Sequence, residues 1–338
     1  MKKDIADGQN AETAQSVPLT GAKVLRRPIK NNSVWARIIK RWDLYLMMVP
    51  GLLCLLIFAY GPMYGIIIAF KDYKPYLGIF DSPWTDMNGW ANFYYAVASR
   101  GFLNLVRNTL ILGALKMIFA FPSSIVLALL LNELRLKWFK KVVQTVSYLP
   151  YFISWVIISG MLYVFLQKDY GLINKVLVSL GMEPVFWYAD PGKWRAILTI
   201  TNIWKNCGWG TIVFLAGFTN ISPDLYEAAT VDGAGRWKQT LHISIPGIMP
   251  VIMVTFVLSI SGLVKDDFEQ IYALVGTNSI LYEKVDVIST WVYRQISNAS
   301  FESYGNGTAV NLMQSLLALI LTLGANFAVR RMGYEGIY

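Results

Sequence analysis

The sequence predicts an all-α polytopic membrane protein, and three observations support this prediction. First, 55% of the 338 residues are hydrophobic and 15% are charged, whereas a typical soluble domain has about 25% charged residues. Second, the hydrophobic residues form blocks of about 20 residues, the length that a helix needs to cross a bilayer. Third, Lys and Arg gather in every second loop between the blocks. Because a lipid-exposed backbone must satisfy its own hydrogen bonds, each block is expected to be a helix.

Six blocks are long and apolar enough to be transmembrane helices. They comprise residues 44–70, 105–131, 142–166, 195–218, 247–264 and 308–329. The predicted organisation is therefore a polar N-terminal tail, 1–43, followed by one six-span membrane domain, 44–338. The tail is expected to be largely disordered. It is not expected to be a signal peptide, because the first block begins too late and lacks a cleavage site of small residues.

The net charge of +9 is explained by membrane topology rather than by nucleic-acid binding. With the N-terminus placed inside, the inside segments hold seventeen Lys and Arg residues, while the longer outside loops together hold nine. This positive-inside bias predicts that both termini lie in the cytoplasm. The protein is therefore expected to contact a lipid bilayer and no nucleic acid.

Several chemical functions are disfavoured by what the sequence lacks. Cys54 and Cys207 both fall within predicted spans, which argues against a disulfide framework and against a thiolate metal site. There is no His-x-x-x-His pair, no Walker-type phosphate loop and no Gly-x-Ser-x-Gly elbow. The chain is therefore predicted to be no enzyme, with no catalytic residue, metal or cofactor of its own.

A polar stretch, "SPDLYEAATVDGAGRWKQTLHISIP", separates the fourth and fifth predicted spans. Ser222 is a good N-cap for a short helix, and Gly233 can adopt the left-handed conformation that ends it after about two turns. A second short helix is expected over 236–243, before Pro246 opens the next span. The sequence thus predicts a helix, a sharp turn and another helix in a cytoplasmic loop, 222–246.

An ordinary cytoplasmic connection would also account for caps and a turn, but the residue spacing is more specific. Glu-Ala-Ala, three residues, Gly-Ala and then Ile-x-Ile-Pro closely resemble the EAA loop of ABC importer permeases, the inner-membrane components of binding-protein-dependent transport systems. The resemblance implies the ABC type I importer permease fold, in which this loop docks in a groove of an ATPase subunit. It assigns the ATPase-coupling role to Glu227, Ala228, Ala229, Asp232 and Gly233.

The resemblance extends over most of the chain from about Asp43. "VPGLLCLLIFAYGPMYGIIIAFKDYKPYLGI", "DFEQIYAL" and "WVYRQ" are similar to permeases of the polysaccharide-type branch of carbohydrate importers. Many sugar permeases carry Gly-Gly-Pro after the Ile-Tyr element, where this chain has "VGTNSILYE". The resemblance implies an importer of oligosaccharides or polysaccharide fragments in a bacterial inner or plasma membrane, with this chain forming half of the translocation pathway.

Such an importer implies several partners for the chain. They are a second homologous permease, an extracellular solute-binding protein and two ATPase subunits, which bind the ATP and Mg. A permease for another solute, such as peptides, is the nearest alternative. An ion-coupled secondary transporter would need carboxylates inside its spans, and the six predicted spans contain none. A membrane scaffold without transport would leave the Gly turn unexplained.

Four polar or aromatic residues of the fourth span are candidates for the substrate path. Asn202, Lys205, Asn206 and Trp209 follow the i, i+3, i+4, i+7 spacing of one helix face. A Lys in mid-span costs about 2.5–3.5 kcal/mol on insertion scales and tends to face protein or water. An indole beside amides and an ammonium group suits a sugar. The alternative is a polar contact with a neighbouring permease, and both interpretations remain open.

The remaining polar residues within spans are less informative. Asn311 and Gln314 share a face near the outer end of the sixth span, where they could line the entrance or simply form a polar helix end. Lys116 lies in the second span without polar neighbours at helical spacing, and for it an ion pair or interhelical contact is expected.

Overall fold

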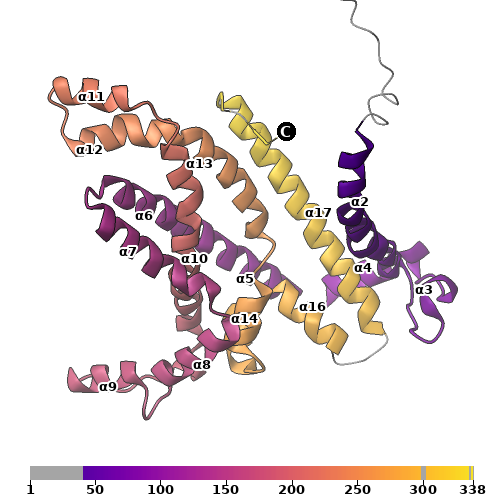
Figure 1. Ribbon diagram of the computed structural model, residues 1–338. Coiled ribbons are helices and arrows are strands. Elements are labelled where there is room, and N and C mark those ends of the chain that lie inside the picture. Colours follow the sequence, from indigo (N-terminus) through magenta and orange to yellow (C-terminus); the bar gives the residue numbers. More distant parts are fainter. Residues whose placement is uncertain (1–40, 298–301, 335, 338) are drawn as a thin grey trace, which may run out of the picture. The chain divides into compact units, whose positions relative to one another are not determined.

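The computed structural model describes residues 41–297, 302–334, 336 and 337. The described residues fall into two compact units, which divide between Pro62 and Met63. Within the described residues all regular structure is helical apart from one isolated bridge between Lys71 and Trp84, so the predicted all-α class is confirmed (Figure 1). The predicted disorder of the tail concerns residues that lie almost entirely outside the described part.

The helices follow one another along the chain with short connections. The first unit contains α2 (Trp42–Leu55) and η1 (Leu56–Tyr60), and η2 (Gly61–Phe70) begins at its end. The second unit continues with α3 (Gly78–Asp81), η3 (Met87–Gly89), α4 (Ala91–Ala98), α5 (Phe102–Leu115), η4 (Lys116–Ala120), α6 (Phe121–Glu133), α7 (Lys137–Tyr148), η5 (Leu149–Phe152), α8 (Trp155–Leu166), α9 (Leu172–Ser179), η6 (Trp187–Ala189), α10 (Pro191–Phe218), α11 (Pro223–Val231), α12 (Arg236–Gln239), η7 (Thr240–Ser244), α13 (Ile245–Ile260), η8 (Ser261–Leu263), α14 (Phe268–Val275), η9 (Ser279–Leu281), α15 (Tyr282–Val285), α16 (Ile288–Ser297) and α17 (Glu302–Arg331).

Four helical stretches of the described residues are long and apolar enough to cross a membrane. They are Trp42–Phe70, Phe102–Glu133, Arg236–Leu263 and Tyr304–Arg331, which match the first, second, fifth and sixth predicted spans. The fourth predicted span lies within α10, a continuous helix of 28 residues whose polar side chains keep it out of this set. The total of six spans therefore stays a prediction.

The third predicted span contains a break that the sequence did not predict. Lys137–Phe152 and Trp155–Leu166 are long and apolar enough to cross a membrane only when they are taken together, and they are bent by 99° relative to each other. The second helix has its own N-cap, because the Ser154 hydroxyl accepts a hydrogen bond from the Ile157 N–H at 3.4 Å. Residues 142–166 thus form two helices that meet at a corner.

α10 is the central helix of the second unit and lies beside α6, α7, α13 and α15 (Figure 1). Two glycines allow its neighbours to come this close. A Cβ atom at Gly208 would lie 2.0 Å from the Ser147 carbonyl oxygen of α7, and one at Gly210 would lie 2.4 Å from the Ser124 hydroxyl of α6. Side chains on α10 are consequently surrounded by protein along much of the helix.

Candidate coupling loop and translocation-path residues

The predicted cytoplasmic loop begins as the sequence suggests. The Ser222 hydroxyl caps α11 by accepting the backbone N–H two residues further on, at 3.3 Å. After α11, Gly233 has φ +74°, and the Ala234 N–H donates to the Ala229 carbonyl at 2.8 Å. The Gly233 N–H donates to the Thr230 carbonyl at 3.1 Å. This pair of bonds is the Schellman motif, which requires a left-handed residue at the position of Gly233.

The second half of the loop differs from the expectation. A separate short helix over 236–243 was expected to end before Pro246, but α12, η7 and α13 form one helical run, Arg236–Leu263. The π-helical turn η7 ends at Ser244, directly before α13. Pro246 is the second residue of α13. Because proline has no N–H to donate, this local change of hydrogen-bond register lets the helix pass through Pro246 without ending.

The sequence-predicted coupling residues lie on the surface of this loop. Glu227, Ala228, Asp232 and Gly233 are exposed, and Ala229 is partly buried. Two apolar residues that the sequence analysis did not single out lie on the same helix pair, namely Val231, which is 89% exposed, and Trp237, which is 79% exposed. These two side chains add apolar surface to the exposed face of the helix pair.

The loop is tied to the end of α6 by a carboxylate. An Arg236 Nη1 atom lies 3.0 Å from the Glu133 side chain and also donates to the Glu133 carbonyl at 3.1 Å. The Thr240 hydroxyl donates to the other Glu133 oxygen at 3.4 Å. Across the turn, the Gln239 amide donates to Thr230 Oγ1 at 3.1 Å and to the Ala234 carbonyl at 3.0 Å. Both halves of the loop are therefore fixed to each other and to α6, a direct neighbour of α10.

The four candidate residues on α10 share one helix but not one environment. Asn202 is buried, and its amide donates to Gln270 Oε1 of α14 at 3.3 Å. Lys205 is also buried, Asn206 is partly buried, and Trp209 is 43% exposed. The polar face predicted from the spacing thus runs from a buried contact with α14 to an accessible indole ring.

Lys205 caps the end of the helix that precedes the break. Its ammonium group donates to the carbonyl oxygens of Pro150, at 3.4 Å, Tyr151, at 2.8 Å, and Ile153. These carbonyls lie at the C-terminal end of η5, where a helix carries partial negative charge and cations are stabilising. In this conformation the three protons of Lys205 are used within its own chain. A role of Lys205 in the substrate path stays a prediction.

Aromatic residues from the break extend the candidate site. The Trp209 ring stacks on Tyr151, with centroids 4.5 Å apart and planes 5° apart, and Phe152 packs against it edge-on at 5.9 Å. Phe152 is 71% exposed. Sequence reasoning missed Tyr151 and Phe152 because their contact with Trp209 joins two separate helical segments, η5 and α10, and leaves no pattern in the spacing of either.

The two candidates on α17 lie in different surroundings. Gln314 is buried, and its amide donates to the Val264 carbonyl at 2.6 Å, just after η8. Asn311 is exposed. No hydrogen bond between described residues joins this pair to the candidates on α10. Gln314 therefore fixes the end of the fifth span to the sixth, while a substrate-path role for either residue stays a prediction.

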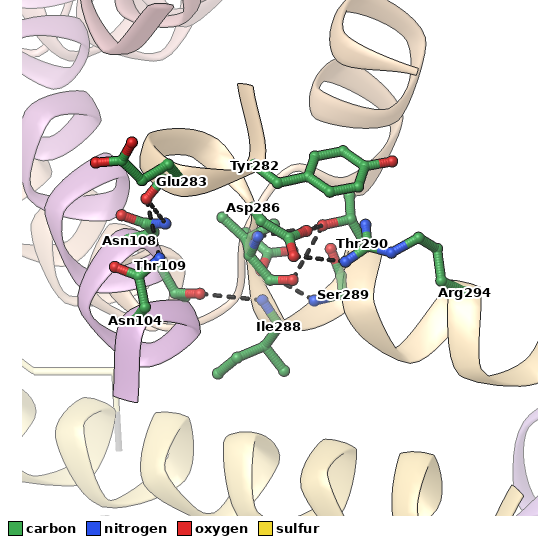
Figure 2. A network of polar contacts seen from close by, with 12 residues as sticks. Asn104, Asn108, Thr109, Tyr282, Glu283, Asp286, Ile288, Ser289, Thr290 and Arg294 are labelled. Atoms are coloured by element: carbon green, nitrogen blue, oxygen red, sulfur yellow. Dashed lines mark hydrogen bonds and ion pairs between the residues drawn. The ribbon is translucent and has the colours of Figure 1, made fainter. Parts of the chain in front are cut away.

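A polar network fixes the segment of α15 and α16 to α5 (Figure 2). The amides of Asn104 and Asn108 donate to the Glu283 carbonyl at 2.9 and 3.2 Å. The Thr109 hydroxyl accepts the Ile288 N–H at 3.1 Å, so it helps to cap α16. The Glu283 side chain points away from these contacts (Figure 2). The segment between the fifth and sixth predicted spans is thus held on the second span by three side chains.

An ion pair completes the same network. The Asp286 carboxylate accepts from the Thr290 hydroxyl at 2.7 Å and from Arg294 at 2.5 Å (Figure 2). The Arg294 guanidinium lies 4.3 Å from the centre of the Tyr282 ring. These contacts connect α15 with the second turn of α16 and make this segment rigid.

Lys116 has the ion-pair partner that its position in a span required. Its ammonium lies 4.0 Å from Asp267, in the connection that follows the fifth predicted span. The neighbouring Asp266 carboxylate accepts the Ser289 N–H at 3.3 Å, and its other oxygen is buried without a partner among the described residues. Burial raises the pKa of Asp266 above its ordinary value, although Ser289 and Lys116 act in the opposite direction.

Comparison with known proteins gives these features a context. The family model for the binding-protein-dependent transport system inner membrane component matches residues 120–334. Protein LplB of Bacillus subtilis is 40% identical over 306 residues, which are 90% of this chain and 94% of LplB. The polygalacturonan/rhamnogalacturonan transport system permease protein YteP of Bacillus subtilis is 39% identical over 97% of this chain and its own full length.

Solved structures agree with these relatives. A chain in the crystal structure of a bacterial alginate ABC transporter, in complex with its alginate pentasaccharide-bound periplasmic protein, is 37% identical with a TM-score of 0.80. The match covers 90% of this chain and 99% of that chain. The predicted permease fold and the prediction of a transport component rather than an enzyme are confirmed. This chain belongs to the family of binding-protein-dependent transport system inner membrane components, the permeases of ABC importers.

Proposed function

We propose that this chain is a permease subunit that imports oligosaccharides or polysaccharide fragments and is coupled to a separate ATPase through α11 and α12. The observation that carries the proposal is the coupling loop. Its Schellman turn is closed at Gly233, its motif residues are exposed apart from the partly buried Ala229, and Val231 and Trp237 are left uncovered. Such a surface suits a partner protein that covers apolar side chains.

The substrate class is inferred from the relatives and from the aromatic residues near the break. YteP is named for polygalacturonan and rhamnogalacturonan transport, and the similar solved structure belongs to an alginate transporter. In this chain the accessible stack of Trp209 on Tyr151 offers an aromatic face of the kind that sugars bind. Fragments of polygalacturonan, rhamnogalacturonan and alginate are therefore the substrates to test first.

The proposed mechanism is alternating access driven from the cytoplasmic side. ATP and Mg are bound by two ATPase subunits, and their closure moves α11 and α12. Since Arg236 and Thr240 are fixed to Glu133, this movement reaches α6 and then the adjoining α10. An extracellular binding protein delivers the sugar, a second homologous permease supplies the other half of the path, and both termini of this chain lie in the cytoplasm.

The proposal is tested by gentle extraction of the tagged protein from its native membrane, followed by mass spectrometry. We expect an ATPase, a second permease and a binding protein to co-purify. The complex is then reconstituted in vesicles with the binding protein, and ATP-dependent uptake of oligosaccharides is compared with uptake of peptides. A chain that purifies alone, or a complex that imports only peptides, would contradict the proposal.

A further inference from the structure

A polar cavity of about 570 Å³ lies between the segment that follows the first span and the start of α17. None of the sequence-predicted site residues lines it. This volume falls within the range of about 300–1,000 Å³ that is typical of small-molecule sites. The lining includes Lys71, Asp72, Trp84, Asp86, Tyr95 and Asn306.

One wall of the cavity is the segment 71–84, whose two ends are joined by backbone hydrogen bonds. Lys71 and Trp84 form an antiparallel bridge, and the Asp72 N–H donates to the Pro83 carbonyl at 2.9 Å. The buried Lys71 ammonium donates to the carbonyls of Ile79 and Phe80, at 2.8 and 2.7 Å. The ammonium group is therefore hydrogen-bonded within the segment 71–84. The same segment carries the Trp84 indole, which lines the cavity.

Aromatic side chains give the cavity accessible flat surfaces. Trp84 is 65% exposed and Tyr95 is 53% exposed. The turn after Asp86 contains two consecutive non-glycine residues in the left-handed region, Met87 and Asn88, with φ 56° and 55°. Left-handed backbone at such residues is unfavourable and persists where surrounding structure requires it, often at ligand sites. Here it sets the direction of the chain that carries Trp84 and Asp86.

The polar atoms of the cavity call for hydrogen-bond donors. The side-chain oxygen of Asn306 is buried and has no partner among the described residues. A buried acceptor of this kind is costly unless a ligand or water donates to it. The Asp86 carboxylate is exposed and accepts no hydrogen bond from the described residues, whereas Asp72 pairs with Lys74 at 3.4 Å. Because the Lys71 ammonium is buried against backbone carbonyls, the accessible unpaired charge among the described lining residues is the Asp86 carboxylate, which suits hydroxyl groups and repels an anionic ligand.

We infer that this cavity binds a neutral, hydroxyl-rich pyranose unit and discriminates against a uronate at the same position. The inference rests on the proposed function, because it adds an outer sugar site to a saccharide importer. The ring lies against Trp84 and Tyr95, and its hydroxyls donate to Asn306 and Asp86. Mixed polysaccharide fragments would thus be oriented by a neutral unit before the chain enters the path beside α10.

The direct test is saturation-transfer NMR on the full chain in lipid nanodiscs, prepared without sugar-based detergents. The probes are galactotriose and trigalacturonate. Each ring of galactotriose carries a hydroxymethyl group where each ring of trigalacturonate carries a carboxylate. We expect saturation transfer to galactotriose and a signal for trigalacturonate that is several-fold weaker. Equal signals would overturn the charge discrimination, and no signal for either probe would overturn the site.

Two variants and a matched control connect the signal to the cavity. Tyr95→Ala removes a lining ring, and Asn306→Leu removes the unpaired oxygen without leaving a void. Each is expected to lower affinity for galactotriose about tenfold, the effect of about one lost sugar contact. Tyr94→Ala serves as the control, because Tyr94 is 57% exposed beside Tyr95 but is not part of the lining. Undiminished binding by both variants would overturn the proposal.

Thermal unfolding and uptake separate the remaining outcomes. Asn306→Leu is expected to unfold at an unchanged or higher temperature, so a loss of binding is not a loss of folding. If the reconstituted importer carries saccharides while galactotriose binding is absent, this inference fails and the proposed function stands. If no saccharide is imported, the proposed function fails. Protection of the cavity from hydrogen exchange by sugar-free binding protein would assign it to protein docking instead and overturn the sugar site.

Discussion

The coupling loop and the break between η5 and α8 are both places where a helix stops and another begins, yet they are closed in opposite ways. At the coupling loop, Gly233 and the two residues beside it close the helix end through local backbone bonds, and the turn is exposed. At the break, the open carbonyls are closed by Lys205, more than fifty residues away on α10, and this side chain is buried. The first closure is local and the second depends on tertiary structure.

This difference predicts how each region responds to substitution. A local closure can change its direction without loss of the helices on either side, because few tertiary contacts depend on it. A closure made by a distant side chain holds two helices together, so its loss should lower stability of the whole unit. Transport should therefore be sensitive to the coupling loop, and unfolding should be sensitive to the break.

The largest effect on transport is expected from Gly233→Val. Left-handed backbone costs an L-residue about 1–2 kcal/mol, more when it is β-branched, so the turn would change direction. We expect ATP-dependent uptake in vesicles to fall by about tenfold or more, an effect of the size that is typical of coupling between two distant sites. The unfolding temperature should change little. Glu227→Ala should lower uptake in the same assay.

Gly235→Val is the matched control for this change. Gly235 lies two residues further on, has φ −66° and has no neighbour that a Cβ would meet. Normal uptake by Gly235→Val together with impaired uptake by Gly233→Val would locate the effect in the left-handed turn. Normal uptake by both Gly233→Val and Glu227→Ala would remove the coupling role.

The largest effect on stability is expected from Lys205→Met. It leaves the carbonyls of Tyr151 and Ile153 without their donor, while Pro150 still accepts the Ile153 N–H, and an unsatisfied buried polar group costs about 1–3 kcal/mol. We expect a lower unfolding temperature in nanodiscs, whereas Asn206→Ala on the same helix should leave it nearly unchanged. Unchanged stability with a higher half-saturation constant for uptake would instead support Lys205 as a substrate contact.

A smaller effect on transport is expected from Trp209→Ala. The substitution removes the ring that stacks on Tyr151, and an aromatic contact of this kind contributes about 0.5–1.5 kcal/mol. We expect about a threefold rise in the half-saturation constant for the sugar that the importer carries. Trp204→Ala is the control, because Trp204 is 45% exposed on the same helix but lies beside Ile158 and Met161. Equal effects of both substitutions would show that Trp209 has no special role.

The smallest effect is expected from Asp266→Asn. Burial raises the pKa of Asp266, so the folded state binds its proton more tightly than the unfolded state, and stability falls as the pH rises from the ordinary value of 3.8 through the raised pKa. Asn cannot ionise, so the variant should lose this pH dependence and unfold about 2 °C higher at neutral pH. Asp267→Asn should unfold lower, since it loses the ion pair with Lys116 while its Oδ1 can still accept the Gln270 N–H. A parallel pH profile of wild type and Asp266→Asn would contradict the assignment.

The same contrast between local and distant closure explains what could be predicted from the sequence. Ser222 and Gly233 act on residues within five positions, so their cap and turn follow from spacing and backbone chemistry. Lys205 is a costly charge within its span, but its partners lie on another helical segment, and neither Pro150 nor the Ser154 cap indicates which helix packs there. Tyr151 and Phe152 were missed for the same reason. The π-helical turn before Pro246 also depends on the continuous helix around it, and the spacing alone suggested two separate helices.

The glycine contacts of α10 have a consequence for how the chain enters the membrane. The polar residues of α10 disfavour its insertion into the bilayer as an isolated helix, because their side chains would contact lipid before they contact another helix. α6 and α7 are synthesised earlier, and Gly208 and Gly210 fit closely against them. The close-packing partners of α10 are therefore already synthesised when it is inserted. A side chain at Gly208 would meet the Ser147 backbone and force α7 and α10 apart, so we expect such a variant to be inserted less efficiently and degraded more readily than the wild type.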